Sequence, residues 1–100
     1  MSVGSAPAWA YIMSFQGDDK AYGYDGDRRV GVCDMEADGN AVEGEYYRVY
    51  ASSSSHLWDT NGAGPDNCVG SGTGAIVNQL RVCEQRFAAP DVCSSWQYRL

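Results

Sequence analysis

The sequence predicts an all-β domain, a small antiparallel β-sandwich or barrel of roughly six or seven short strands stapled by two disulfides. Runs of β-branched and aromatic residues recur along the 100 residues, with no convincing helical period. Turn residues (Gly, Asn, Asp, Pro) separate these runs about every eight to twelve positions. The four cysteines form no C-x2-C pair, which favours disulfides over a zinc site.

Length and charge restrict the class of protein. We expect residues 1–100 to form a single domain, with residues 1–7 as a flexible lead-in. Disulfides in so small a domain indicate a secreted, extracellular protein, and we expect its signal peptide to have been removed. A net charge of −6 leaves no basic surface for nucleic acid or an anionic membrane. No apolar run approaches the roughly 20 residues of a membrane-spanning helix.

The first two predicted strands flank a polar turn. Residues 8–15 are apolar and aromatic, and they follow Pro7, which has no N–H to donate to a sheet. Residues 20–24 predict a short edge strand. A second turn, with the Asp and Gly residues that turns favour, follows at 25–27.

Residues 29–50 predict a central hairpin around the Asp-Gly-Asn turn at 38–40, the strongest short turn pattern in the chain. Its register stays open. A loop at the first two turn residues pairs Val32 with Glu45, and a loop one residue later pairs Val32 with Tyr47. Both registers place acidic residues opposite one another near the turn, which is unfavourable unless water or a cation screens them.

Three more strands are predicted in the second half of the chain. Residues 56–59 form a short strand that carries Trp58 into the core. A glycine-rich loop at 60–74 is anchored by its cysteine, because an unanchored loop of this length is uncommon. Residues 75–85 form a central strand on account of their β-branched content, and residues 93–100 form the last strand.

The cysteines allow three pairings. Cys83 and Cys93 flank a turn, whereas Cys33 lies in the predicted hairpin and Cys68 in the long loop. Loop closure therefore favours Cys33–Cys68 with Cys83–Cys93. The nested alternative, Cys33–Cys93 with Cys68–Cys83, stays open.

The acidic residues of the predicted hairpin resemble a calcium-binding loop. The pattern D-x-E-x-D-G-N-x4-E repeats the oxygen spacing of an EF-hand. Strands rather than helices flank it, however, and a solvated turn accounts for the same residues. Calcium is the lesser alternative, with the ligands Asp34, Glu36, Asp38, Asn40 and Glu45. We expect no cofactor.

Catalytic patterns are weak. A Ser–His–Asp triad would need His56, the only histidine, with a serine from 52–55 and Asp59, but no G-x-S-x-G pattern is present. Glu43 and Glu45 could act as an acid/base pair, yet glycosidases need a cleft that a stapled domain of this size rarely has. We therefore expect no catalytic residues and no enzyme activity.

Tyrosine and tryptophan are abundant, and both are enriched at protein interfaces and in cross-strand pairs. The predicted partner-binding residues are Trp9, Tyr11, Tyr46 and Tyr47. Residues 5–15 either add as a strand to a partner's sheet or form the first strand of the domain, and we favour the second.

Several segments together resemble small secreted, disulfide-bonded β-proteins of actinomycetes: VCDMEADGNAVEGEYYR (32–48), LWDTNG (57–62), RVCEQ (81–85) and PDVCSSW (90–96). More loosely, size and cysteine usage are similar to those of the small adaptor subunits of secreted umbrella-shaped toxin particles. The resemblance implies a protein that links other subunits and has no catalytic motif.

We therefore expect a secreted, non-enzymatic interaction or adaptor protein, with a bacterial toxin or antagonism complex as the setting that the resemblance implies. The expected partner is a protein, with no nucleic acid and no membrane. The alternatives are an inhibitor of an extracellular hydrolase, which would present residues 60–74, and a calcium-binding β-domain.

Overall fold

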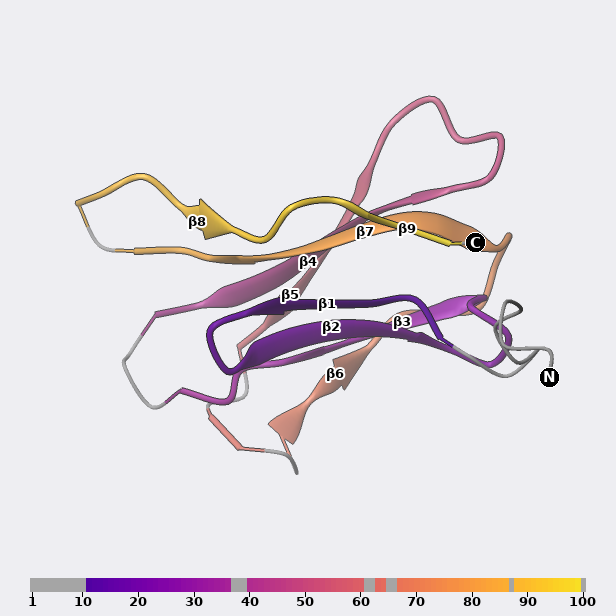
Figure 1. Ribbon diagram of the computed structural model, residues 1–100. Helices are drawn as coiled ribbons and strands as arrows, with labels where there is room; N and C mark the ends of the chain where they lie inside the picture. The colour runs from indigo at the N-terminus through magenta and orange to yellow at the C-terminus, as the bar shows by residue number, and fades with distance from the viewer. Residues whose placement is uncertain (1–10, 37–39, 61–62, 65–66, 87, 100) are drawn as a thin grey trace, which may run out of the picture.

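Two antiparallel sheets packed face to face make up the molecule (Figure 1). The computed structural model describes residues 11–36, 40–60, 63–64, 67–86 and 88–99. These residues form nine strands, so the predicted all-β sandwich is confirmed. Within the same residues no helix has the length and apolar character needed to cross a membrane.

Sheet A has the strand order β1-β2-β3-β6, with β1 at Met13–Gln16, β2 at Asp19–Tyr24, β3 at Arg29–Cys33 and β6 at Val69–Gly70. Its register places small and branched side chains in one row across the sheet, namely Ser14, Ala21, Val32 and Val69. The strand predicted at 20–24 therefore lies inside the sheet and is not an edge strand. The sequence pattern gave no indication of β6 within the glycine-rich loop.

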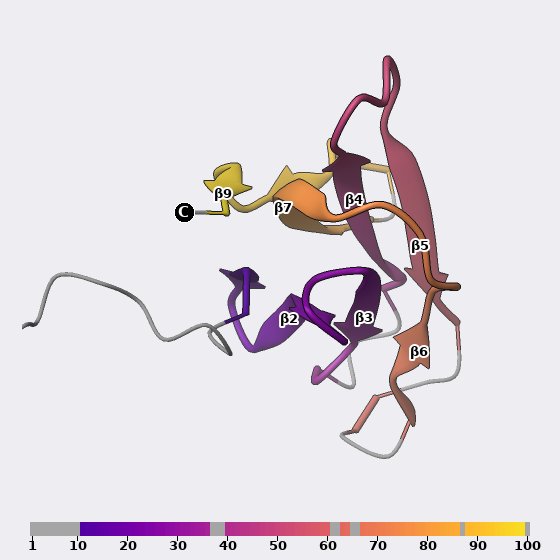
Figure 2. The same ribbon diagram turned by 90° about the vertical axis from the view of Figure 1, so that its right-hand side faces the viewer.

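Sheet B has the strand order β5-β4-β7, with β5 at Ser55–Asp59, β4 at Val42–Arg48 and β7 at Val77–Glu84. Two short strands, β8 at Val92–Cys93 and β9 at Gln97–Tyr98, pair with successive parts of the other edge of β7. The single last strand predicted at 93–100 is thus divided in two. Viewed from the side, β5 and β6 lie at the same side of the sandwich (Figure 2).

The central hairpin predicted at 29–50 is wrong. Strand β3 pairs with β2 and β6 in sheet A, whereas β4 pairs with β5 and β7 in sheet B. The chain crosses from one sheet to the other between them, so that Val32 and Val42 enter the same core from opposite sides. Crossing over also removes the pairing of acid against acid that a hairpin would have imposed.

The core fills the space between the sheets with mostly aliphatic side chains: Ile12, Ala21, Val30, Val32, Val42, Tyr46, Val77, Leu80 and Val82. Trp58, which was predicted to enter the core, is instead 39% exposed. Successive residues of a strand point to opposite faces, and Leu57 and Asp59 take the inward positions of β5. Trp58 is therefore directed outward.

Both predicted disulfides are confirmed. Cys33–Cys68 joins the end of β3 to the glycine-rich loop, and Cys83–Cys93 joins β7 to β8. The described part of the loop is also hydrogen-bonded to sheet A, because Gly64, Ser71 and Gly74 donate backbone N–H groups to carbonyls of residues 34, 30 and 28.

Candidate functional site

The described residues among those predicted to bind a partner do not form one surface. Trp9 lies outside the described residues. Tyr46 is buried in the core, which corrects its assignment to a binding surface. Tyr47 points outward from sheet B and packs on Trp96, with 5.5 Å between the ring centroids. Only Tyr11, which is 52% exposed, lies on an open apolar surface.

That surface follows strand β1, at the edge of sheet A. Tyr11, Met13 and Phe15 are 52%, 43% and 56% exposed, respectively, while the alternating Ile12 and Ser14 are buried. Because side chains alternate along a strand, the three exposed residues form one apolar stripe. We call these three residues the β1 stripe.

Among the described residues, no strand pairs with the outer edge of β1. Gly23 N–H donates to the Ile12 carbonyl at 2.8 Å, so in an antiparallel pair the backbone groups of Met13 and Phe15 point away from β2. Residues 11–16 contain no charge and no proline, although proteins commonly place such residues on edge strands to prevent unwanted pairing. The β1 edge is therefore able to accept another strand.

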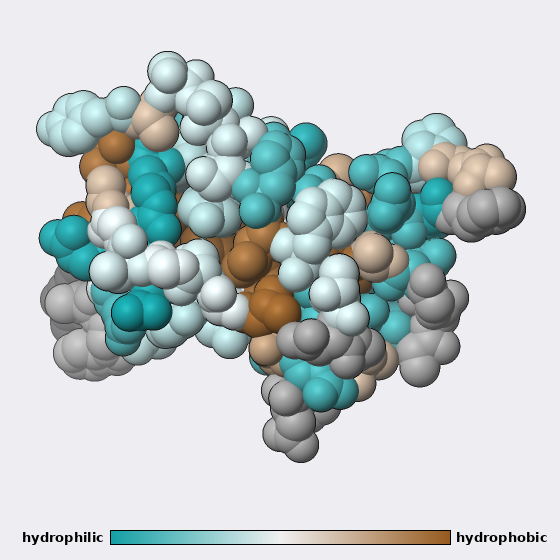
Figure 3. All heavy atoms as spheres, turned by 180° about the vertical axis from the view of Figure 1, so that it is seen from behind, coloured by the Kyte–Doolittle hydropathy of each residue, from teal (hydrophilic) through white to brown (hydrophobic). Residues whose placement is uncertain are grey.

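Aromatic side chains continue from the β1 stripe across the outer face of sheet A. Tyr22 lies opposite Met13 on the neighbouring strand, and Tyr24 follows it with ring centroids 5.9 Å apart. The two rings cover Gly31 and Gly70, which have no side chain to displace them. Viewed from behind, by contrast, brown apolar surface is limited to small areas among teal and pale residues (Figure 3).

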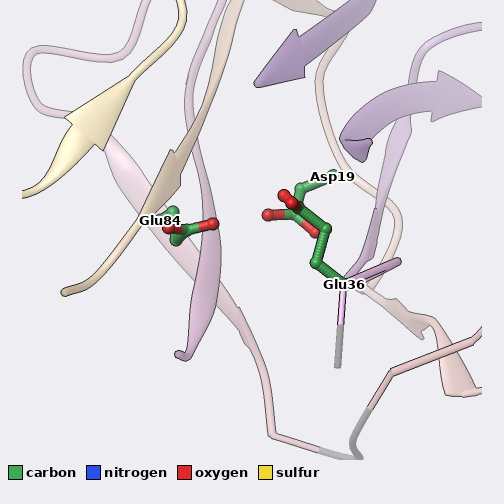
Figure 4. Close-up of side chains that lie close together, drawn as sticks. All are labelled: Asp19, Glu36 and Glu84. Atoms are coloured by element: carbon green, nitrogen blue, oxygen red, sulfur yellow. The ribbon is translucent and has the colours of Figure 1, made fainter. Parts of the chain in front are cut away.

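A second site lies at one end of the sandwich, where carboxylates from separate strands meet. Asp19 begins β2, Glu84 ends β7, and Glu36 lies just after β3. One ligand atom from each lies within 4.8 Å of the others. In Figure 4, Asp19 and Glu36 lie side by side and Glu84 points toward them from the opposite sheet. We call these three residues the acidic centre.

Further carboxylates hold the backbone around the acidic centre. The N–H groups of residues 34, 35 and 36 donate to Asp59 Oδ2, Asp19 Oδ1 and Asp34 Oδ1 at 2.9, 2.9 and 3.0 Å. Asp34 and Asp59 are both buried. These bonds fix the segment that carries Glu36 against the ends of both sheets.

The electrostatics of Asp19 are unusual. Its side chain is fully buried, and no N–H group among the described residues donates to Oδ2. Burial raises the pKa of the Asp19 carboxyl to about 7; the bond from Met35 N–H opposes this rise. Glu36 adds to the rise, both through its negative charge and by accepting a hydrogen bond from the protonated form of Asp19, and so does the charge of Asp34. Ionisation of Asp19 is therefore unfavourable at this crowded, largely buried position.

The calcium ligands predicted from the EF-hand spacing are not assembled as that pattern indicated. Glu36 belongs to the acidic centre, Asp34 accepts the Glu36 N–H beside it, and Asn40 Nδ2 donates to Glu84 Oε1 at 3.3 Å. Asp38 lies outside the described residues. Glu45 faces the outside of sheet B, where Arg81 binds it at 2.6 Å. Spacing along the chain could not reveal Asp19 and Glu84, although both continue the inward alternation of their strands.

The residues weighed as catalytic form a polar network on the outer face of sheet B. His56 Nδ1 lies 2.9 Å from Glu43 Oε2, and His56 Nε2 lies 3.4 Å from Ser54 Oγ. The Ser54 hydroxyl donates to Glu45 Oε2 at 2.7 Å, so its proton is directed away from the histidine. Asp59, the acid first considered for a triad, points inward instead.

Comparison with protein families, with curated proteins and with solved structures finds no match for this chain.

Proposed function

We propose that the protein is a secreted, non-enzymatic binding protein that captures a protein partner by adding a strand of that partner to the β1 edge of sheet A. One observation carries this proposal: in the part of the chain that the structure describes, no strand pairs with the outer edge of β1, and residues 11–16 present the β1 stripe without any charge or proline. The two disulfides support an extracellular setting. A subunit of a secreted bacterial complex would fit the same description.

Strand addition would use both the free backbone groups of the β1 edge and the apolar side chains beside them. Backbone groups of an added strand would bond to those of Met13 and Phe15, and each net hydrogen bond is worth roughly 0.5–1.5 kcal/mol. The apolar side chains beside them would provide side-chain selectivity and lose contact with water. An extended partner segment with alternating apolar residues has the matching chemistry.

The hydrolase-inhibitor alternative has less support. An inhibitor presents a loop that projects into an active site, whereas the described part of residues 60–74 is bonded along sheet A through Cys68, β6 and three backbone hydrogen bonds. No observation favours this alternative over strand addition.

The test uses the full chain, with its disulfides formed, as bait in culture supernatant from the source organism. Met13→Pro removes an N–H that faces away from the sheet, so the fold should persist while strand addition is blocked. We expect wild-type protein to retain a specific partner that Met13→Pro loses, as measured by quantitative mass spectrometry.

Tyr50→Asn is the matched control, because it removes a fully exposed aromatic residue from the loop between β4 and β5. Tyr50 has a φ of 65°, which asparagine tolerates. The control should retain the partner. Equal retention by Met13→Pro would overturn the proposal, and so would a partner that Tyr50→Asn loses to the same extent.

A further inference from the structure

We propose that Asp19, Glu36 and Glu84 form a binding site for Ca²⁺ between the two sheets. The proposal does not depend on the partner-binding function, and it uses residues from three separate segments of the chain. Its basis is the convergence of three carboxylates on one point, together with a buried oxygen of Asp19 that lacks a hydrogen-bond donor.

The spacing of the ligand atoms suits calcium. Calcium binds oxygen at 2.3–2.6 Å, so two oxygens on the same ion are at most about 5 Å apart. The three ligand atoms lie within 4.8 Å of one another, inside that limit. Carboxylates can bind through one or both oxygens, and three of them can therefore supply much of a shell of six to eight oxygens.

Two buried side-chain oxygens at this position receive no hydrogen bond from the described residues, which indicates the kind of ligand that the site can bind. Asp19 is 0% exposed, and its Oδ2 has no partner in the described part of the chain. Gln16 lies directly opposite Asp19 on the neighbouring strand, so the two side chains share a face, and its buried Oε1 lacks a partner as well. Oxygen atoms that no N–H or O–H group reaches are the atoms that a hard cation binds.

Basic side chains do not neutralise Asp19 or Glu36 in the described structure. Its ion pairs join arginines and His56 to Asp25, Asp27, Glu43 and Glu45, and none of them involves Asp19 or Glu36. Two further buried acids, Asp34 and Asp59, accept backbone N–H bonds from the segment that carries Glu36. Repulsion among these carboxylates favours a divalent ion over an empty site.

Calcium titration of the EDTA-treated, disulfide-intact chain tests the proposal. By isothermal calorimetry we expect a dissociation constant of about 10⁻⁴–10⁻³ M, the range of extracellular calcium modules. Calcium should also raise the melting temperature, because the ion binds the folded state. Magnesium prefers a smaller octahedral shell, and we expect it to bind about tenfold more weakly.

Two variants and a control decide the assignment. Asp19→Asn keeps an oxygen for Met35 N–H and should weaken calcium binding at least about tenfold; Glu36→Gln, on a half-buried segment, should weaken it by a similar factor and serves if the first variant fails to fold. Asp25→Asn removes the same charge at an exposed turn and should bind as the wild type does. No calcium heat up to about 10 mM, wild-type affinity in Glu36→Gln, or equal affinity for magnesium would overturn the proposal.

Discussion

The carboxylate of Glu45 lies on the outer face of sheet B, between the Ser54 hydroxyl and the Arg81 guanidinium. Burial tends to raise its pKa, but these two donors and the nearby His56 outweigh burial and lower the pKa below its ordinary value of 4.5. A lowered pKa in the folded state stabilises the fold above the ordinary pKa. That contribution disappears as pH falls through the folded-state pKa.

Replacing Arg81 with methionine should therefore destabilise the protein in a pH-dependent way. We expect the free energy of unfolding at pH 7 to fall by about 1–2 kcal/mol. Hydrogen bonds to charged groups are worth about 1.5–3 kcal/mol, and solvent screens the partly exposed Arg81. The difference from wild type should narrow as the pH falls through the lowered folded-state pKa of Glu45, because the protonated carboxyl no longer pairs with Arg81. Urea unfolding at pH 7, 5 and 3 measures the difference in unfolding free energy between the two proteins.

Part of the stability lost in Arg81→Met should stay lost at low pH, because Arg81 also lies 4.6 Å from the centroid of the Trp96 ring. Arg86→Met provides the comparison, since this exposed arginine forms no ion pair in the described structure. A difference between Arg81→Met and wild type that stays constant from pH 7 to pH 3 would contradict the assignment.

Strand β4 can lie close to sheet A because one of its inward-facing residues is glycine. A Cβ at Gly44 would come within 2.6 Å of Val32 Cγ2 and 3.5 Å of Ala21 Cβ. Gly44 pairs with Leu57 and Val82 at the centre of sheet B. The absent side chain thus sets how closely the two sheets can pack.

Gly44→Ala should destabilise the fold by about 1–3 kcal/mol, because the added methyl group overpacks the core. Unfolding in urea with the disulfides intact measures the change. Gly72→Ala adds the same group where nothing lies within 4 Å and should have little effect. Val32→Ala should offset part of the penalty in the double variant, and a Gly44→Ala protein as stable as Gly72→Ala would show that the sheets do not meet here.

The whole molecule depends on two covalent links of different reach. Cys33–Cys68 spans 35 residues and attaches the glycine-rich loop to sheet A, whereas Cys83–Cys93 spans 10 residues within sheet B. Chain entropy assigns about 4 kcal/mol to the longer loop and about 3 kcal/mol to the shorter one. For a domain of this size either loss is a large fraction of the total stability.

Replacing both cysteines of a pair with alanine tests this order. The variant without Cys33–Cys68 should have the lower melting temperature and the lower urea midpoint. Buried Cys33 and Cys83 leave similar small voids, so the two variants are comparable controls for each other. If the variant without Cys83–Cys93 lost as much stability or more, loop length would not determine which disulfide contributes more.

Local chemistry along the chain determined the strand content, the use of disulfides and, through loop closure, their pairing. Alternation along the strands also places two acids on the same face as core residues: Asp19 is in phase with buried Ala21, and Glu84 with buried Val82. An acid in phase with a core row indicates a carboxylate that faces inward. That pattern could have identified two members of the acidic centre.

Only the tertiary structure decided which strands pair. The Asp-Gly-Asn turn at 38–40 predicts that β3 pairs with β4, but the two strands lie in different sheets. Strand β3 pairs with β2 and the distant β6, and β4 pairs with β5 and the distant β7. Pairing depends on how whole faces pack, a property of distant segments that no local pattern contains. For the same reason the meeting of Asp19 with Glu84, across two sheets, exists only in the folded molecule.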